Sequence, residues 1–473
     1  MRRATDGLYR NDMVLATSPQ GSPLDICYST DVNSILAQYH FSGRSAREIA
    51  SGIEAAVTTG NVEPGERLPS VRRLAVELEV SPATVASAYR DLRSRGIVTG
   101  RSRGRTTVSL RPPLRVRSEA PVPVGTRDLA TGNPDPRLLP DLEEALRLVA
   151  MRTRLYREPL VVPEFAAAAR VRLEEIGLDG SEFTVVGGAM DGIERVLQAH
   201  LRPGDRVAVE DPGYSGVLDL LAAMGFERHP VRVDNEGMIP DALAEALRFG
   251  VSAVVLTPHA QNPTGAFITP PRAADLRAVL DSAPEVTVVE DDHLGLSADP
   301  PYGTLVDRRS RWAFVRSVSK TLGPDLRVAL LTGDPVTVSR VEGRMSLGAG
   351  WISGVLQRLV AALWNDPGVD ALVTQAARTY SARRQALIAA LRRRNITAFG
   401  ASGLNVWIPV TQESSIVAGL LERGWAVRAG EAHRLTAPPA VRVTTATLEP
   451  EEAEAFSEDM LAVLHPPHRT RIA

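Results

Sequence analysis

The residue type that most clearly implies chemistry is the lysine of the segment SVSKTLGPDLRVA, residues 317–329. The chain has 54 lysine and arginine residues, and Lys320 is the only lysine among them. Arginine supplies a positive charge equally well, but its guanidinium does not deprotonate and cannot attack a carbonyl. A retained lysine therefore suggests a Schiff base with a carbonyl compound. The alternative is an incidental surface lysine, and the lysine count alone leaves both readings open.

Groups that could bind a phosphate lie near Lys320 and at the start of an expected helix. Ala189 and Met190 would open a helix after an apolar run, where backbone N–H groups bind anions. Ser317, Ser319 and Arg327 flank the lysine and supply hydroxyls and a guanidinium for the same phosphate.

Three further residues could hold an aromatic ring. Asp291 follows the apolar run VTVVE and could face a protonated ring nitrogen, Asn262 could donate to a phenolic oxygen, and Tyr214 could cover the ring face. A pyridoxal phosphate site requires an amine for the aldehyde, an anionic side chain that faces the ring nitrogen, and hydrogen-bond donors for the phosphate. Each motif also has an ordinary structural reading, as a turn or an exposed loop, but their order along the chain favours one site.

The elements that must position these residues alternate between strand and helix. A helical pattern at 189–201 follows the first of several apolar runs. This alternation predicts an α/β body with a mostly parallel sheet, with ligand residues at the carboxyl ends of strands. The expected strands and the turns after them lie at 182–188, 205–214, 251–265, 285–293 and 311–320.

Composition describes an ordinary globular chain of 473 residues, 44% hydrophobic and 23% charged. No apolar run is long enough to span a bilayer, and the N-terminus lacks the apolar stretch of a secretory signal. Cys27 is the one cysteine, and the eight histidines show no metal-ligand spacing. We expect a cytoplasmic protein without a metal site.

A basic unit precedes this body. Residues 44–110 hold eleven arginines against seven acidic residues, which points to nucleic acid. Helical patterns at 44–60, 70–78 and 81–96, followed by an alternating basic hairpin at 97–110, predict a winged helix-turn-helix. A solvated charged face and a protein-docking module are the alternatives.

The second helix of the pair would enter the major groove, and the wing would meet the backbone or minor groove. The expected DNA contacts are Arg72, Ser81, Thr84, Arg103, Gly104 and Arg105.

The expected domain boundaries follow from these patterns. Residues 1–34 carry no interpretable pattern, 35–110 form the winged helix-turn-helix, and 111–127 form a proline-rich linker. Residues 128–473 form the effector domain.

The segment LPSVRRLAVELEVSPATVASAYRDLRSRGIV resembles the DNA-binding domain of GntR-type regulators. Residues 128–464 resemble a fold-type-I aminotransferase that depends on pyridoxal phosphate. This second resemblance rests on GNPDPRLLP, GGAMDGIERV, EDPGYSG, NPTG, EDDH, SVSK with GPDLRVA, and VRVTTATL. The whole chain resembles the MocR subfamily of GntR regulators.

The resemblance implies roles for individual residues. Lys320 would form the aldimine, Asp291 would face the pyridine nitrogen and Arg442 would pair with an effector or substrate carboxylate. Asn262, Tyr214 and Arg327 would take the ring and phosphate contacts described above. His293 stands where better-known members have a tyrosine at the phenolic oxygen, and Tyr156 would reach the partner's phosphate site in a head-to-tail homodimer.

Two functions fit these patterns. The first is a transcriptional regulator that binds operator DNA and senses pyridoxal phosphate or an amino compound through Lys320. The second is a working aminotransferase with an accessory DNA-binding domain. The basic N-terminal unit favours the regulator, because an ordinary aminotransferase has no use for it.

Overall fold

The computed structural model describes residues 44–58, 62–63, 65–94, 97–99, 106–108, 122–150, 152–295, 303–306 and 309–465. They form two compact units, built mainly from residues 44–108 and from residue 122 onward. Within these ranges, no helix is long and apolar enough to cross a membrane. Most of the expected proline-rich linker lies outside the described residues, and Arg127 already belongs to a strand.

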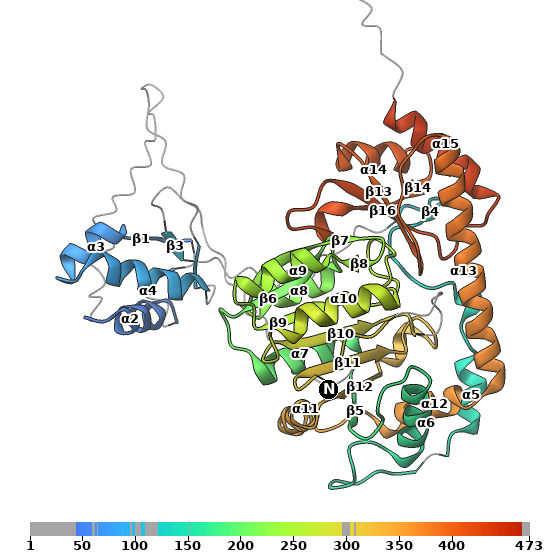
Figure 1. Ribbon diagram of the computed structural model, residues 1–473, viewed down its shortest axis with the longest axis horizontal. Helices are drawn as coiled ribbons and strands as arrows, with labels where there is room; N and C mark the ends of the chain where they lie inside the picture. Colours follow the sequence, from blue (N-terminus) through green and yellow to red (C-terminus); the bar gives the residue numbers. More distant parts are fainter. Residues whose placement is uncertain are drawn as a thin grey trace, which may run out of the picture. The chain divides into compact units, whose positions relative to one another are not determined.

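The small unit has the expected helices and a short sheet with the strand order β1-β3-β2 (Figure 1). Ser70 caps α3 by accepting from the N–H of Arg73 at 3.3 Å, and Ser81 accepts from the N–H of Thr84 at the start of α4 at 3.1 Å. The elements are α2 (Ala46–Thr58), β1 (Arg67–Leu68), α3 (Val71–Glu77), α4 (Pro82–Ser94), β2 (Val98–Thr99) and β3 (Thr106–Val108).

The core of the small unit follows from helical spacing. Val85, Ala88, Tyr89 and Leu92 lie on one face of α4 and are all buried. The Tyr89 hydroxyl donates to the Pro69 carbonyl at 2.7 Å, which joins α4 to the loop before α3. Apolar packing and the buried Tyr89 hydrogen bond therefore help to hold the helix-turn-helix together.

The large unit is built around an eight-stranded sheet. Four neighbouring strands, β11, β10, β9 and β6, are parallel, β7 continues them, and β12 is antiparallel to both of its neighbours. The strand order is β5 (Phe183–Val186), β12 (Ala329–Gly333), β11 (Trp312–Ser317), β10 (Thr287–Asp292), β9 (Ala253–Leu256), β6 (Arg206–Asp211), β7 (Glu227–Asp234) and β8 (Gly237–Met238). The predicted α/β class with a mostly parallel sheet is confirmed.

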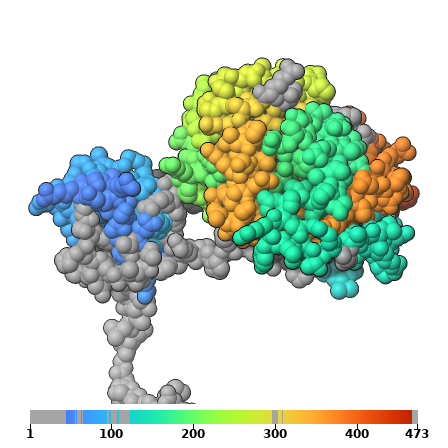
Figure 2. All heavy atoms as spheres, turned by 90° about the horizontal axis from the view of Figure 1, so that it is seen from below, coloured from blue at the N-terminus to red at the C-terminus, as the bar shows by residue number. Residues whose placement is uncertain are grey.

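Helices cover both faces of this sheet, so its strands are apolar on both sides. Along β10, Val288 packs with one helix layer and Val289 with the other, as successive side chains point to opposite faces. One layer contains α7 (Ala189–His200), α8 (Ser215–Ala223) and α11 (Pro335–Leu347). The other contains α6 (Pro163–Glu174), α9 (Pro240–Arg248), α10 (Pro270–Asp281) and α12 (Gly354–Trp364). Figure 2 shows the teal segment that contains α6 beside the orange surface of later helices.

A C-terminal subdomain completes the large unit. The 27-residue helix α13 (Pro367–Arg393) packs on the sheet layer through Val369 and Val373, and on the subdomain core through Leu387 and Leu391. The subdomain has a β13-β16-β15 sheet, and β14 pairs with β4. Its elements are β4 (Arg127–Asp128), β13 (Asn405–Pro409), α14 (Glu413–Leu421), β14 (Trp425–Ala426), β15 (Arg428–Ala429), β16 (Ala440–Thr444) and α15 (Glu452–Leu464).

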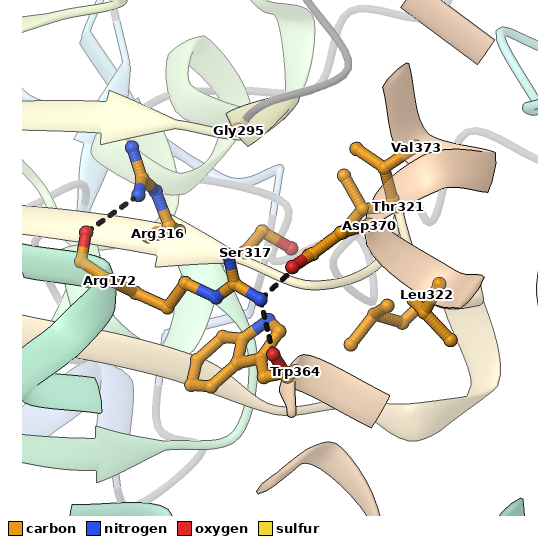
Figure 3. Close-up of a pocket in the computed structure, with 10 residues that line it drawn as sticks. Arg172, Gly295, Arg316, Ser317, Thr321, Leu322, Trp364, Asp370 and Val373 are labelled. Atoms are coloured by element: carbon orange, nitrogen blue, oxygen red, sulfur yellow. Dashed lines mark hydrogen bonds and ion pairs between the residues drawn. The ribbon is translucent and has the colours of Figure 1, made fainter. Parts of the chain in front are cut away.

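A buried ion pair joins the ends of β10 and β11. Arg316 donates to Asp292 at 2.7 Å, and the two side chains are 5% and 0% exposed. Arg316 also donates to the Arg172 carbonyl at 3.2 Å, and Arg172 pairs with Asp370 of α13 at 2.7 Å (Figure 3). Burial raises the pKa of Asp292, but the charges of Arg316 and His259, together with hydrogen bonds from Arg316 and the Gly295 N–H, outweigh burial and lower this pKa overall. The network thus connects the sheet, α6 and α13.

We expect Arg316→Met to lower the free energy of unfolding by about 3–5 kcal/mol, because Asp292 would keep a buried charge without its cation. Arg206→Gln, which removes an exposed pair with Glu227, should cost less than about 1 kcal/mol. Urea unfolding of both variants measures the difference. Equal losses would contradict the role assigned to the buried pair.

Candidate functional site

A cavity of about 280 Å³ lies at the carboxyl edge of the sheet. It brings together every residue that we predicted to hold the cofactor, except Tyr156, and it includes the predicted effector residue. The predicted residues that line it are Ala189, Met190, Tyr214, Asn262, Asp291, His293, Ser317, Ser319, Lys320, Arg327 and Arg442.

The sheet explains this convergence. Strands β6, β9, β10 and β11 are neighbours and run in one direction. Tyr214, Asn262, His293 and Lys320 each follow the end of a different one of these strands. Residues far apart in the sequence therefore meet at one edge.

One end of the cavity is shaped to hold a phosphate. Gly188, the N-cap of α7, has φ +102°, and a Cβ there would lie 2.6 Å from Nη2 of Arg327. The Ser319 hydroxyl is buried and has no hydrogen-bond partner within the described residues, while its N–H donates to Ser317 at 3.2 Å. A helix N-terminus, a guanidinium and a hydroxyl without a protein partner fit a phosphate.

Asp291 fits a protonated ring nitrogen. The side chain is buried, and its Oδ1 has no hydrogen-bond partner in the described part of the chain. Burial, and secondarily the neighbouring Asp292 charge, raise the pKa of Asp291 to about 7. A cationic N–H in the cavity would satisfy this oxygen and restore the charge.

Two residues border the space where a ring would lie. A Cβ on Gly216 would lie 2.6 Å from the Tyr214 ring, so glycine at this position lets the aromatic side chain fold over the start of α8. The side-chain oxygen of Asn262 accepts a hydrogen bond from Nη1 of Arg442 at 3.2 Å. Its amide nitrogen can therefore donate to an oxygen on the ring.

Lys320 is prepared to act as a neutral amine. Its Nζ donates to the Gly132 carbonyl at 2.7 Å. Burial, and then the charge of Arg442, lower the pKa of Lys320 to about 8. Burial and the Lys320 charge lower the pKa of His293 to about 4, so this imidazole is neutral at pH 7. The lowered pKa gives Lys320 a larger neutral fraction near pH 7–8 than an ordinary lysine has, and the neutral amine is the form that attacks a carbonyl.

The structure adds two residues, His433 and Arg428, that the sequence did not single out. His433 lies beside the predicted Arg442, with its Nε2 3.4 Å from that guanidinium and its Nδ1 3.1 Å from the Gly213 carbonyl. Arg442 also contacts the Ala130 carbonyl. Arg428 also lines the cavity. The alternation of β15 and β16 could have placed Arg428 on the face of Arg442, but His433 ends a short 3-10 helix, Gly430–His433, for which the sequence carries no such signal.

The remaining predicted residues lie elsewhere. Tyr156 is 84% exposed and packs edge-on against Trp351 with ring centroids 5.5 Å apart, so its role in a partner subunit stays a prediction. Arg72 and Ser81 are exposed, and the Ser81 hydroxyl lies 2.8 Å from that of Thr84. The predicted wing contacts Arg103, Gly104 and Arg105 lie outside the described residues.

Two family models match the chain. Residues 126–459 match the aminotransferase class I and II family, and residues 45–108 match the gntR family of bacterial regulatory proteins. The two matched segments correspond to the two units described above.

Curated relatives resemble the chain over both segments. The vitamin B6 salvage pathway transcriptional repressor PtsJ of Salmonella typhimurium is 39% identical over 89% of this chain and 99% of its own length. The regulator TauR of Rhodobacter capsulatus is 28% identical over 74% of this chain and 80% of its own length. The pyridoxine biosynthesis transcriptional regulator PdxR of Corynebacterium glutamicum is 28% identical over 52% of this chain and 55% of its own length.

Solved aminotransferases share the fold of the large unit. An archaeal alanine:glyoxylate aminotransferase matches with a TM-score of 0.65 at 20% identity, over 72% of this chain and 90% of its own. The α-aminoadipate aminotransferase LysN of Thermus thermophilus matches with a TM-score of 0.64 at 23% identity, over 72% of this chain and 92% of its own.

We expect Gly188→Ala to weaken pyridoxal phosphate binding roughly tenfold or more, since alanine is strained at φ +102° and its Cβ would displace Arg327. Gly343→Ala is the matched control, because its Cβ meets nothing within 4 Å. Titration followed by visible absorbance measures both affinities. Unchanged affinity in Gly188→Ala would contradict the phosphate assignment.

The rate of cofactor capture by cofactor-free protein should rise with pH to a midpoint near 8 and then level off. Only the deprotonated amine attacks, so the rate falls about tenfold per pH unit below the pKa of Lys320. Arg442→Gln should move the midpoint upward, because it removes a nearby positive charge. A midpoint near the ordinary value of 10.5 in the unaltered protein would refute this assignment.

Proposed function

Because this chain belongs to the GntR regulators of the MocR type, which join a winged helix-turn-helix to an aminotransferase class I and II domain, we propose that pyridoxal phosphate held at Lys320 controls its affinity for operator DNA. The protein is a DNA-binding regulator, and its cofactor is pyridoxal phosphate. The observation that carries the proposal is the buried Oδ1 of Asp291, which faces the same cavity as the lysine and has no partner in the described residues.

The names of two relatives support a vitamin B6 signal. PtsJ is named for vitamin B6 salvage and PdxR for pyridoxine biosynthesis. These names are consistent with a chain that senses the cofactor itself or an amino compound that reacts with it. The alternative of a working aminotransferase has no comparable support, because these relatives are named as regulators.

The residues divide the work of holding the cofactor. Bound pyridoxal phosphate supplies an aldehyde that a neutral amine can capture and a ring nitrogen that can carry a proton. Lys320 would provide the amine, Asp291 would keep the proton on the ring nitrogen, and Arg327 with the N-terminus of α7 would neutralise the phosphate. Tyr214 would cover the ring and exclude water from one face.

Signal transmission requires two states that bind the ligand with different affinity. The cavity is lined by the sheet edge and by the C-terminal subdomain, which are joined where Asp211 accepts from the N–H groups of Leu435, Thr436 and Ala437. Cofactor that contacts both parts would favour one arrangement of the subdomain. A head-to-tail homodimer, with Tyr156 reaching the partner's phosphate site, would carry that change to two DNA-binding units.

Anisotropy titration on DNA from upstream of the protein's own gene tests the proposal. We expect cofactor loading to change DNA affinity by roughly 5–150-fold at fixed salt. Lys320→Arg keeps the charge but cannot capture the aldehyde, so its DNA affinity should not respond to the cofactor.

The outcomes separate the components of the proposal. If loaded and unloaded protein bind DNA equally, the cofactor is not the signal and an amino compound takes its place. If Lys320→Arg responds as strongly as the unaltered protein, capture at the lysine is not the control step. Binding no tighter than to random DNA would refute the operator-binding role.

A further inference from the structure

The outer face of α4, the second helix of the helix-turn-helix, begins with small side chains. The buried face of this helix packs on the core of the small unit. A helix turns about 100° per residue, so the opposite face begins with Ala83 and continues with Ser87. Ala83 is exposed and Ser87 is half-buried. The first residue of α4 with a charged or amide side chain is Arg90, in the third turn.

This sequence limits how α4 can distinguish bases by hydrogen bonding. The most selective contacts in the major groove use arginine or lysine on guanine, asparagine or glutamine on adenine, and acidic residues on cytosine. In a helix-turn-helix, the N-terminal residues of the second helix contact the base edges. Arg90 lies seven residues after Ala83, about 10 Å further along the helix axis. The first two turns of α4 therefore bring none of these side chains to the bases.

The hydroxyls at the start of α4 add little discrimination. The Ser81 hydroxyl accepts from the Thr84 N–H at 3.1 Å, and the hydroxyl oxygens of Ser81 and Thr84 lie 2.8 Å apart. One of the two hydroxyl protons is therefore held between these oxygens. Serine and threonine hydroxyls also bond to more than one kind of base. An apolar contact is the stronger source of selectivity at this end of the helix.

From this surface we propose that α4 recognises thymine, with Ala83 and the ring of Pro82 packing against the 5-methyl group in the major groove. Both residues are exposed, and contact of alanine with the thymine methyl is a form of direct base recognition. The DNA-binding role itself rests on the match of residues 45–108 to the gntR family. The inference goes beyond the cofactor signal, because it names the base that the small unit selects.

Anisotropy titration at fixed salt tests the proposal on a duplex that the full-length protein selects from a random-sequence library. Replacing one thymine at a time by uracil removes only the methyl group and leaves base pairing and the minor-groove edge unchanged. We expect uracil at the contacted position to weaken binding about fourfold, because one buried carbon group of this size contributes about 0.8 kcal/mol. Uracil at thymines outside the contact should leave the affinity unchanged.

Ala83→Gly removes the side chain that makes the proposed contact. The thymine and uracil duplexes should then bind this variant equally at the position found in the scan. Comparing two duplexes on one protein cancels any general loss of affinity that glycine causes in a helix. The dependence of affinity on salt should stay as in the unaltered protein, because the phosphate contacts remain.

Two further variants serve as controls. Ala46→Gly makes the same change at the start of α2, at a half-buried residue outside the proposed contact, and should keep the full preference for thymine. Arg72→Gln removes an exposed cation from α3, the helix expected to cross the DNA backbone. It should weaken binding to both duplexes by the same factor and lower the salt slope by about one.

Three results would overturn the proposal. These are a uracil scan that changes the affinity at no position, a thymine preference that survives Ala83→Gly, and selected duplexes without a conserved A·T pair. A conserved A·T pair that tolerates uracil would belong to the first of these results and would indicate recognition through the minor groove or DNA shape. Titrations of loaded and cofactor-free protein separate this inference from the proposed function. We expect the same ratio of thymine to uracil affinity in both forms, whereas a change of overall affinity on loading tests the cofactor signal.

Discussion

The site depends on two adjacent carboxylates at the end of β10 that face opposite sides of the sheet. Asp292 points into the α6 layer, where Arg316 neutralises it. Asp291 points to the other face, into the cavity, and its Oδ1 has no partner within the described residues. Asp292 is neutralised within the fold, whereas Asp291 is the carboxylate that we propose to meet the ring nitrogen of the cofactor. A strand alternates its side chains, so the sequence pair Asp-Asp supplies both roles at consecutive positions.

The second constraint is the joining of two subdomains around the cavity. The sheet edge supplies the residues that we propose to hold the phosphate and the ring, while β15 and β16 supply Arg428 and Arg442. The Leu435 N–H donates to Asp211, and the His433 ring lies within hydrogen-bond distance of the Gly213 carbonyl, so these contacts hold the two edges together. A ligand that spans the cavity therefore contacts both parts at once, which is the condition for converting occupancy into a change of conformation.

Short-range sequence patterns predicted the strands and helices and the residues that directly follow the parallel strands. Apolar runs ending in polar residues located β6, β9, β10 and β11, and parallel neighbours placed their ends together. The pattern missed Arg428 and His433 because their positions depend on how the C-terminal subdomain packs against the sheet edge. Tyr156 lies away from the cavity of its own chain, so no pattern within one chain can test its role.

The scarcity of lysine has a practical side as well. A chain with one lysine has one ε-amine that an acylating or alkylating reagent can modify, and this amine is partly buried where it lines the cavity. A protease that cuts only after lysine can divide the polypeptide at a single bond, after residue 320. Reductive trapping of the captured aldehyde would block that cut. The cleavage pattern of the denatured chain would then record what fraction of molecules carried cofactor in the cell.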